Sequence, residues 1–356
     1  MSDLLSTTAL GAEAVHHPTS TTSLHSLLAP PASFTTTVPK ELVHRAAVAE
    51  VLLTRWRRID DRFFSVSAQW PRGHSFFSSP DGLHHDSTLI AETIRQVGTL
   101  LAHAEFAVPL TSRFLLHDLE FTAVLHQLTV RDTPAELEVL VSTTVTRQHG
   151  RRVAGLRYQM TILRDGQIAA VANVSATFMS PEVYRRVRDN RITPPAAHLQ
   201  PAPPVEPALV GRLTPQDVVL SGIGETNRWQ LRLDTRHPVL FDHPGDHVPG
   251  MVMLEAARQA ARILVPEATL VSSADSEFTH YVEFDSPCFI EATERPAEHP
   301  NRRTVAVRAE QEGRTVFTST LTVPTCLLNG TRSSGDAYGQ SRASAELSHP
   351  WVCSPA

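Results

Sequence analysis

Two long apolar stretches with helical periodicity dominate the hydrophobic pattern of this chain. The first reads STLIAETIRQVGTLLAHAEF and predicts a helix over residues 87–105. The second reads MVMLEAARQAARIL and predicts a helix over residues 250–265. Both stretches are too apolar to lie on a surface, so each predicts a helix at the centre of a packed core.

Each stretch is interrupted by the same polar pattern, E-x-x-R-Q, and the two copies begin 163 positions apart (255 minus 92). Charged groups inside an apolar helix are costly unless they have a partner or a chemical role. Because this energetically costly pattern recurs at matched positions of both helices, it predicts one fold duplicated in tandem, with a polar site on each helix. The i, i+3, i+4 spacing places each trio on one helical face. The trios are Glu92, Arg95 and Gln96, and Glu255, Arg258 and Gln259.

The elements around the two helices follow one order. In each half a short strand leads into a loop rich in His, Gly and Pro, the helix follows, and four β-rich runs come after it. Glycine-containing pairs at 149–150, 165–166 and 312–313 are hairpin signals. This order predicts an α+β fold in which an antiparallel sheet curls around one helix, twice over. The expected strands are 62–70, 112–125, 136–148, 151–164 and 167–179 in the first half, and 228–234, 276–284, 287–295, 302–311 and 314–323 in the second.

Composition divides the chain into five segments. Residues 1–33 are rich in Ser, Thr, Ala and Pro and predict a disordered extension. A proline-dense stretch predicts a linker over 188–208, since proline fits neither a helix interior nor a central strand. The two repeats are then expected at 34–187 and 209–324. Residues 325–356 have no hydrophobic periodicity and predict a disordered tail.

Charge and cysteine content exclude several classes of function. The net charge is −5 and the pI is about 6.4, so the chain has no basic footprint for nucleic acid. Lys40 is the single lysine, which leaves arginine as the fixed cation for an anionic ligand. The three cysteines have no metal-ligand spacing. No basic segment opens the chain, and no apolar run reaches the ~20 residues of a membrane helix. We therefore expect a cytoplasmic protein that binds no membrane, no metal and no cofactor.

The loop before the second helix, FDHPGDHVPGMVMLE, resembles the active-site segment of β-hydroxyacyl-ACP dehydratases. In those enzymes a His-x-Pro-Gly loop precedes Pro-Gly, four apolar residues and a glutamate. Here Pro-Gly at 249–250 and Glu255 keep that spacing, and Gly250 is expected to allow close backbone approach at the helix entry. The loop is shorter than in those enzymes, so either His243 or His247 takes the place of the catalytic histidine.

Three segments of the first half resemble a more specific family. The segment HHDSTLIAETIRQVG (84–98), the following AHAEFAVP (102–109) and the opening VPKELVHR (38–45) are similar to the A-factor biosynthesis hotdog family, the AfsA-like γ-butyrolactone synthases. The resemblance covers residues 34–325 and implies a double hotdog, with two tandem repeats each wrapping a central helix. It also implies an acyltransferase that joins a β-ketoacyl group from acyl carrier protein to dihydroxyacetone phosphate, on the way to a signalling lactone. The family's functional residues then correspond to Glu92, Glu255 and Arg258.

The residue types suit that chemistry. A carboxylate half-buried in an apolar helix is expected to have a raised pKa and to act as the base for the attacking alcohol. Free N–H groups at the start of the second helix, near Gly250, offer donors to the oxyanion. Arginine binds phosphate bidentately, so Glu255 is expected to be the base and Arg258 to hold the phosphate of the acceptor. The residues expected to bind substrate are Arg95, Gln96, Gln259, His85, Asp86 and Gly250.

Each of these sequence features also has a less specific interpretation. An E-x-x-R pair is most often an intrahelical ion pair, a loop histidine is most often solvated, and Asp86 is equally suited to capping the first helix. The hotdog fold alone would equally suit an acyl-ACP dehydratase or thioesterase, although neither needs a phosphate clamp beside the glutamate. A non-catalytic sensor of acyl groups or lactones is a third interpretation. The chain is expected to be a monomeric double hotdog or a homodimer.

Overall fold

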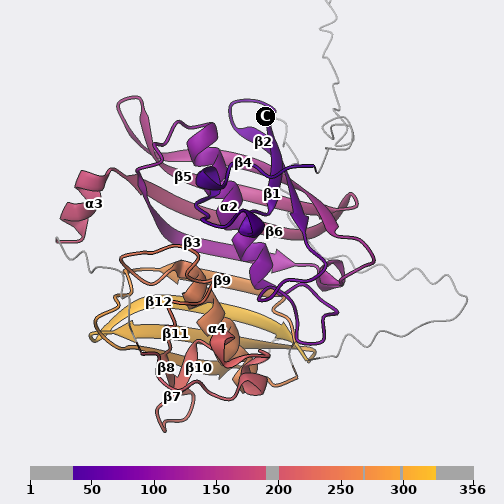
Figure 1. Cartoon of the computed structure of the whole chain (residues 1–356), viewed down its shortest axis with the longest axis vertical. Coiled ribbons are helices and arrows are strands. Elements are labelled where there is room, and N and C mark those ends of the chain that lie inside the picture. The colour runs from indigo at the N-terminus through magenta and orange to yellow at the C-terminus, as the bar shows by residue number, and fades with distance from the viewer. Residues whose placement is uncertain (1–34, 190–199, 268, 297–299, 326–356) are drawn as a thin grey trace, which may run out of the picture.

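The computed structural model describes residues 35–189, 200–267, 269–296 and 300–325. The predicted N-terminal extension (1–33) and the tail from 326 onward lie outside the described residues, as do residues 190–199 of the predicted linker. The rest of the chain forms two similar halves, shown in indigo to magenta and in orange to yellow in Figure 1.

The described strands form one twelve-stranded antiparallel sheet in the order β1-β2-β4-β5-β6-β3-β9-β12-β11-β10-β8-β7. The first half contains β1 (Leu53–Arg58), β2 (Phe63–Trp70), α2 (Thr88–Ala104), β3 (Arg113–Ala123), β4 (Ala135–His149), β5 (Arg152–Arg164), β6 (Gln167–Met179) and the short helix α3 (Pro181–Val187). The second contains β7 (Leu220–Gly222), β8 (Arg228–Leu231), α4 (Gly250–Leu264), β9 (Ser273–Phe278), β10 (Cys288–Arg295), β11 (Arg302–Gln311) and β12 (Arg314–Pro324).

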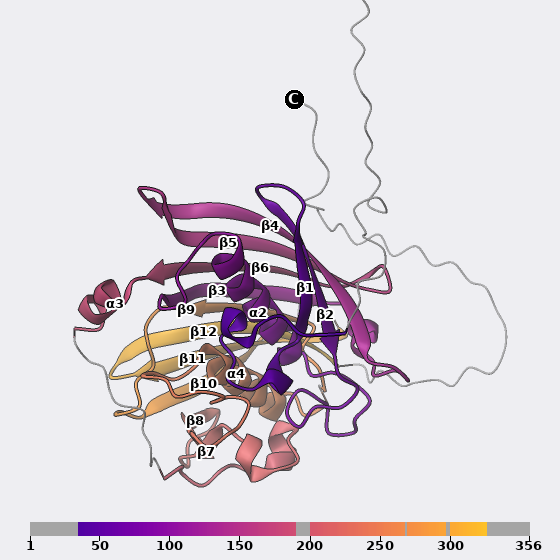
Figure 2. The same cartoon turned by 45° about the horizontal axis from the view of Figure 1, so that its top comes forward.

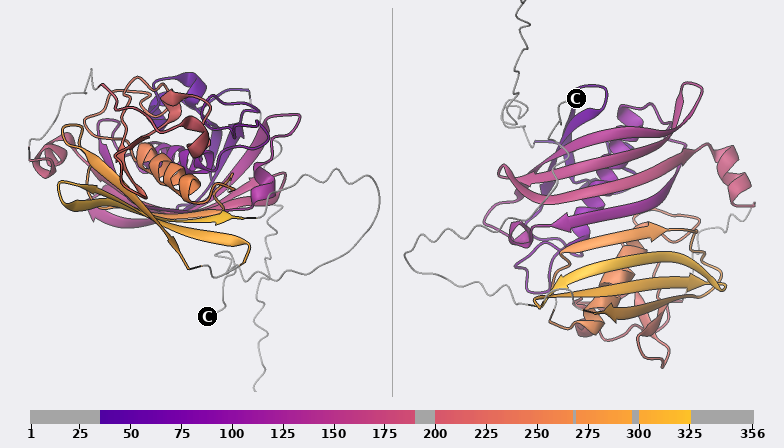
Figure 3. Two further views of the ribbon diagram at one scale, coloured as in Figure 1. Left: turned by 90° about the horizontal axis from the view of Figure 1, so that it is seen from below. Right: turned by 180° about the vertical axis from the view of Figure 1, so that it is seen from behind.

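The two halves join through one strand pair. β3 of the first half pairs antiparallel with β9 of the second, with Asp118 opposite Glu277 and Thr122 opposite Ser273. Both long helices lie on the same, concave face of the resulting sheet (Figures 1 and 2). Seen from below, the sheet curls around them, and seen from behind, its outer face lies in front of both helices (Figure 3). The predicted α+β fold of two helix-wrapping repeats is confirmed.

The apolar pattern explains which faces are buried. Along β6 the buried positions on the inner face include Ala170, Ala172, Val174 and Phe178, which are separated by multiples of two residues as expected for one face of a strand. Helix α2 is buried over nearly its whole circumference, with Ile94, Leu100 and Leu101 at 0% exposure. Sheet residues cover one side of each helix, and the short 3-10 turns before β1 and β7 cover the other. This coverage is why both helices contain almost no exposed polar stripe.

The hairpin signals also hold. Asp165 and Gly166 both have positive φ, as do Glu312 and Gly313, which is the geometry of the tight turns that match the twist of paired strands. The strand predicted over 276–284 is shifted, because β9 ends at Phe278. Beyond it the chain leaves the sheet: Val282 accepts a hydrogen bond from the Val248 N–H at 2.9 Å, and Glu283 forms a buried ion pair with Arg188.

Several elements were not predicted. The strands β1 and β7 are short edge strands with weak patterns, and α3 lies next to the predicted linker. Part of that linker is packed against the second half, since the Val205 N–H donates to Leu220 O at 3.0 Å and residues Pro207–Val210 form a 3-10 helix. The C-terminal part of 188–208 is therefore part of the second repeat.

Substitution Leu100→Ala tests the central position of α2. This side chain has 0% exposure, so its truncation removes buried surface and leaves a cavity that should cost about 2–5 kcal/mol of unfolding free energy. Val145→Ala on β4, where the side chain is 42% exposed, is the control and should change stability by less than about 0.5 kcal/mol. Urea unfolding monitored by tryptophan fluorescence measures both. Equal effects would contradict the buried position of α2.

Candidate active site

Each central helix contains a buried glutamate held by two arginines. Glu92 on α2 is 1% exposed. The Arg95 side chain donates to it through Nε at 2.9 Å and Nη2 at 2.7 Å, and Arg45 donates through Nε at 3.0 Å. Gln96 is the third residue that donates to this carboxylate, through its amide at 2.6 Å. The i, i+3, i+4 trio therefore does share one face, and its carboxylate is fully paired.

The second helix repeats this arrangement almost atom for atom. Glu255 on α4 has 0% exposure and accepts from Arg258 through Nε and Nη2, both at 2.8 Å. Arg212 donates to the same carboxylate at 2.8 and 2.6 Å, and Gln259 donates at 2.5 Å. The duplicated motif is thus a duplicated buried ion cluster.

The second arginine of each cluster was not predicted as a site residue, although Arg45 ends the VPKELVHR segment that carries the family resemblance. Arg45 and Arg212 each follow a 3-10 helix whose cap is left-handed, His44 with φ 52° and Gly211 with φ 64°. The sequence contains a signal for both, because the chain reads LVHR at 42–45 and LVGR at 209–212. A search for further repeats at a spacing near 163 would have found this pair.

The two glutamines connect each cluster to the backbone. Gln96 donates to Glu50 O at 2.8 Å and accepts from the Leu52 N–H at 2.9 Å. Gln259 makes the matching bonds, to Asp217 O at 2.8 Å and from the Val219 N–H at 3.0 Å. Both side chains therefore hold the 3-10 segment against the helix, and neither lines the cavity described below.

The charge state of the glutamates differs from the sequence expectation. Burial alone would raise the pKa of Glu92, but the charges of Arg45 and Arg95 and their hydrogen bonds outweigh it and lower the pKa to about 2. Arg212 and Arg258 likewise outweigh burial and lower the pKa of Glu255 to about 2. The expected raised pKa is therefore wrong, because the sequence did not reveal the second arginine of either cluster.

The helix N-termini distinguish the two halves. At the start of α2 the Asp86 carboxylate accepts from the Thr88 N–H at 2.9 Å and lies 3.4 Å from Arg212 and 3.7 Å from Arg258. The matching position before α4 is Pro249, which provides no side-chain cap. Within the described residues, the N–H groups of Gly250 and Met251 have no recorded acceptor, so the positive end of α4 is open.

A cavity of about 310 Å³ lies at this open end, between the two halves. Its walls come from α2, β3 and β6 of the first half and from the loop 242–250, the start of α4 and residues 278–282 of the second. Along β3 the lining residues go from exposed Arg113 through half-buried Phe114 to buried Leu119. The cavity therefore runs from a cationic rim into an apolar interior, whose further lining residues include Ile94, Leu116, Tyr158, Val174, Ala176, Phe178 and Phe317.

The two arginines at the cavity rim, Arg95 and Arg113, come from the first half. The Arg95 side chain is 24% exposed and lines the cavity, whereas Arg258 is 8% exposed and does not. Among the described residues, Arg95 Nη1 has no hydrogen-bond partner. The guanidinium of Arg113 likewise makes no hydrogen bond or ion pair with them, and it lies over the Tyr184 ring. Asp242 comes within 4.0 Å of Arg45 but binds the N–H groups of Ala46 and Ala47 instead. An anion at the rim thus meets two available guanidinium groups.

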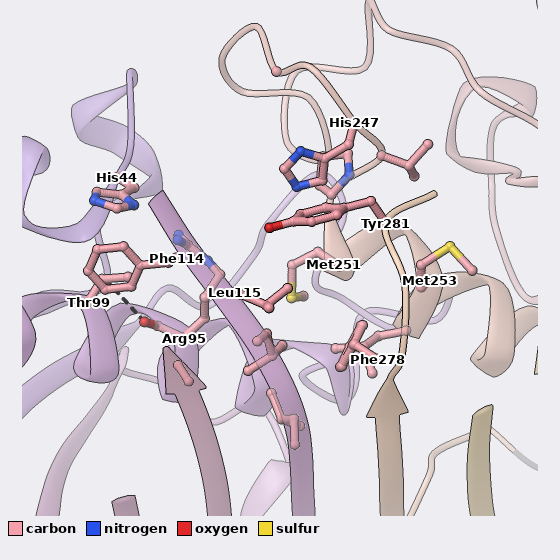
Figure 4. Close-up of a pocket in the computed structure, with 18 of the residues that line it drawn as sticks. His44, Arg95, Thr99, Phe114, Leu115, His247, Met251, Met253, Phe278 and Tyr281 are labelled. Carbon is pink, nitrogen blue, oxygen red and sulfur yellow. Dashed lines mark hydrogen bonds between the residues drawn. The ribbon is translucent and has the colours of Figure 1, made fainter. Parts of the chain in front are cut away.

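The second half contributes a carboxylate–imidazole pair to the opposite wall. His247 Nδ1 lies 2.8 Å from Asp246, whose carboxylate also accepts from the Tyr184 hydroxyl at 2.9 Å. Figure 4 shows His247 and Tyr281 facing His44, Phe114 and Arg95 across the cavity. The Tyr281 hydroxyl is buried without a recorded partner, and burial raises its pKa to about 12, so it remains a donor.

The predicted site residues therefore separate into two groups. Arg95, His243, His247 and Gly250 line the cavity, with His243 54% exposed at its side chain and Gly250 packed against the Phe278 ring. Glu92 lies behind Arg95. The remaining predicted residues do not line the cavity, and these are Glu255, Arg258, Gln96, Gln259, His85 and Asp86.

Two of those remaining residues have structural contacts that explain their type. His85 is 2% exposed with its ring 5.3 Å from that of Trp70, and burial lowers its pKa to about 4. Asp86 caps α2 and neutralises the second arginine pair. Among the described residues, no group of three or more His, Cys, Asp or Glu is placed to hold a metal ion. No described helix is long and apolar enough to cross a membrane.

The buried clusters predict acid sensitivity. Each glutamate has its pKa lowered from about 4.5 to about 2 by folding, so its contribution to stability is present above pH ~4.5 and is lost as the pH falls toward 2. Glu255→Gln should lower the unfolding free energy by about 3–5 kcal/mol at pH 7, because Arg212 and Arg258 lose their carboxylate. Urea midpoints between pH 7 and 3 should fall less steeply for the variant than for the wild type. Parallel pH curves would contradict the lowered pKa.

Comparison with known proteins places this architecture in a family. A 2-oxo-3-(phosphooxy)propyl 3-oxoalkanoate synthase of Streptomyces virginiae is 47% identical over 304 residues, which cover 85% of this chain and 100% of the relative. A protein of the same name from Streptomyces coelicolor is 42% identical over 81% of this chain and 91% of its own. The solved 12:0-ACP thioesterase of Umbellularia californica is 12% identical, with a TM-score of 0.44 over 74% of this chain and 97% of that one. That likeness is too distant to bear on substrate or mechanism.

The family match covers both halves separately. The model of the A-factor biosynthesis hotdog domain matches residues 28–180 and again residues 194–327. Two matches on one chain agree with the two helix-wrapping repeats of the sheet, and together they confirm the double hotdog. The chain belongs to the A-factor biosynthesis hotdog domain family.

Proposed function

We propose that this protein is a 2-oxo-3-(phosphooxy)propyl 3-oxoalkanoate synthase. It transfers a 3-oxoacyl group from a thioester to the hydroxyl of dihydroxyacetone phosphate, forming the ester from which a γ-butyrolactone signal is made. The observation that carries the proposal is the cavity itself, in which two available arginines, an uncapped helix N-terminus and an apolar interior meet. The arginines suit a phosphate, the helix N-terminus suits a developing oxyanion, and the apolar interior suits an acyl chain.

The phosphate of the acceptor binds at the rim. Arg95 has Nη1 available, and its other nitrogens are fixed on Glu92 and on Val43 O, so the guanidinium is held in place before substrate arrives. Arg113 supplies a second guanidinium from β3, supported over the Tyr184 ring at 5.6 Å. Planar guanidinium groups bind phosphate with paired hydrogen bonds. The buried Glu92 thus acts as the anchor of a phosphate-binding arginine.

The thioester carbonyl lies at the start of α4. The N–H groups of Gly250 and Met251 point from a helix of 15 residues, where backbone dipoles favour negative charge. Donors fixed in advance stabilise a tetrahedral oxyanion without reorganisation, which is usually the largest electrostatic contribution to acyl transfer. The 3-oxoacyl chain extends between β3, β6 and α2, where the lining side chains are apolar.

The pair Asp246–His247 serves the leaving group. The carboxylate fixes the ring orientation through Nδ1 and offers a counter-charge when the ring is protonated, so Nε2 can deliver a proton to the departing thiolate. His243 lacks such support, because its contact with Asp242 is 3.4 Å and its side chain is exposed. This geometry favours His247 over His243, a choice that the sequence left open.

The thioester donor is an acyl carrier protein. Helix α3 contributes Tyr184 to the His247 wall and presents Arg185 and Arg186 to solvent on its outer side. Exposed arginines beside the cavity suit a carrier whose surface is acidic, and they would steer it toward the rim. The carrier's prosthetic arm would then reach the cavity from the side of His247.

The two halves meet at two related positions, where the arginine cluster of one half faces the helix N-terminus of the other, and one of these positions carries the site. At the other position Asp86 closes the N-terminus of α2 and pairs with Arg212 and Arg258 of the second half. An anionic substrate there would meet a buried carboxylate in place of an open helix end. The second cluster therefore stabilises the fold, and the first cluster supports catalysis.

A product assay with the purified full-length chain tests this function. We expect a 3-oxoacyl carrier protein and dihydroxyacetone phosphate to give the phosphorylated ester or its cyclised butenolide, detected by mass spectrometry. Arg113→Ala should raise the KM for dihydroxyacetone phosphate by roughly 10-fold or more, since one charge-assisted contact is worth about 1.5–3 kcal/mol. Arg308→Ala, an exposed arginine on β11, is the control. Free acid or enoyl product that forms without acceptor would instead indicate a thioesterase or dehydratase.

A further inference from the structure

His44 lines the cavity beside Arg95 and belongs to neither ion cluster. It caps the 3-10 helix before Arg45 in the left-handed conformation, which turns its side chain toward α2 and β3. There its ring packs edge-on against Phe114 at 4.8 Å and contacts His103. In the sequence, His44 lies in the VPKELVHR segment, and no role was predicted for it.

Two hydrogen bonds determine which nitrogen of His44 carries a hydrogen. His103 Nδ1 lies 2.6 Å from Val108 O, and a carbonyl only accepts, so Nδ1 of His103 is the protonated nitrogen. Nε2 of a neutral His103 is then an acceptor. It lies 2.8 Å from His44 Nε2, which must donate to it. His44 Nδ1 is left with a lone pair, and it has no recorded partner among the described residues.

Both rings are neutral in the unliganded protein. Burial lowers the pKa of His103 despite the opposing bond to Val108. Burial also lowers the pKa of His44, and the nearby charges of Arg95 on α2, His103 on α2, His243 on the facing loop and Arg113 on β3 bring it to about 3. Two of these groups, Arg95 and Arg113, are the arginines to which the proposed function assigns the acceptor's phosphate.

We propose that His44, oriented by His103, is the base that takes the hydroxyl proton of the phosphorylated acceptor, and that the acceptor's own phosphate activates it by neutralising Arg95 and Arg113. The inference rests on the proposed function and assigns the proton acceptor that the Asp246–His247 pair, on the opposite wall, leaves unassigned (Figure 4). His103 is a positioning residue in this arrangement, because it touches no substrate and acts through His44.

Every bond and every proton is accounted for in this step. As the acceptor oxygen bonds to the thioester carbon, its O–H proton passes to His44 Nδ1. The C–S bond then breaks, the electron pair stays on sulfur, and the thiolate takes a proton from protonated His247. Exchange with solvent returns both rings to their starting states. The net change is one thioester and one alcohol giving one ester and one thiol.

Activation of His44 by the bound phosphate would let the site discriminate against water as the acceptor of the acyl group. A base whose pKa is near 3 is a poor proton acceptor at neutral pH. Water in the cavity leaves Arg95 and Arg113 uncompensated, so His44 stays weak and the thioester is not hydrolysed. A phosphate dianion offsets both cations at short range and raises the pKa of His44 at the moment the correct acceptor is bound.

The other repeat lacks this arrangement. The residue matching His44 is Gly211, and the position matching His103, 163 residues on, is Pro266. A Cβ at Gly211 would lie 3.6 Å from the Arg262 side chain and 3.8 Å from that of Arg258, so arginine fills the space. The histidine pair is therefore confined to the half in which the helix N-terminus opposite is open.

Steady-state kinetics of variants of the full chain test the base. His44→Gln should lower kcat for transfer to dihydroxyacetone phosphate by about 100-fold or more, with the KM for the thioester changed by less than about threefold. His103→Gln should keep most activity, because its amide can accept from His44 and donate to Val108, whereas His103→Leu should lose it. His117→Gln on β3, outside the cavity, is the control.

A titration of the ¹⁵N-histidine-labelled wild type tests the activation in the unaltered site, and a variant is used only to assign the signal. The His44 signal, assigned by its absence in His44→Gln, should show a neutral ring with hydrogen on Nε2 from pH 7 to about 4. Dihydroxyacetone phosphate without thioester should raise the pKa of His44 by roughly one unit or more. A ring with hydrogen on Nδ1, or an unchanged titration with ligand, overturns the inference.

The proposed function and the proposed role of His44 can be disproved independently of each other. A wild type that makes no acceptor-dependent product removes the proposed function. A wild type that makes the product while His44→Gln keeps kcat within about threefold leaves the function intact and removes His44 as its base.

Discussion

A buried carboxylate in the middle of an apolar helix is the constraint on which this structure depends. An unpaired ionised group there would cost many kcal/mol, so Glu92 and Glu255 require cations at short range. One arginine comes from the same helix, and the other must come from elsewhere in the chain. The need for Arg45 and Arg212 determines where the two 3-10 segments dock, and the glutamines then fasten those segments to the helices.

The same constraint produces a framework for binding anions. Once Glu92 holds the Nε side of Arg95, the guanidinium is fixed with Nη1 left over at the cavity rim. The carboxylate is thus separated from the substrate by the arginine that it orients. A pKa near 2 suits this role, because an anchor must stay ionised at every working pH, whereas a general base must exchange its proton.

One position at the helix start decides which of the two helix N-termini is open. Asp86 caps α2 and completes the charge balance of Arg212 and Arg258, which leaves that half as a closed ion network. Pro249 in the matching position leaves α4 uncapped, and the loop before it provides Asp246 and His247. Duplication of a fold therefore kept both stabilising clusters while opening a cavity beside the first.

The sequence determined the repeat, the two central helices, most of the antiparallel strands and the shared face of Glu, Arg and Gln. These features depend on local periodicity and spacing, which can be read from neighbours along the chain. The pairing of Glu92 with Arg45 and of Glu255 with Arg212 depends on contacts over more than forty residues, and so does the meeting of His44 with His103. Tertiary structure decided these pairings, and with them the ionisation of the glutamates. It also decided that Arg95 faces the cavity and Arg258 does not. Arg95 faces the open helix end after Pro249, whereas Arg258 lies against the Asp86 carboxylate, which only the packing of the two halves brings there.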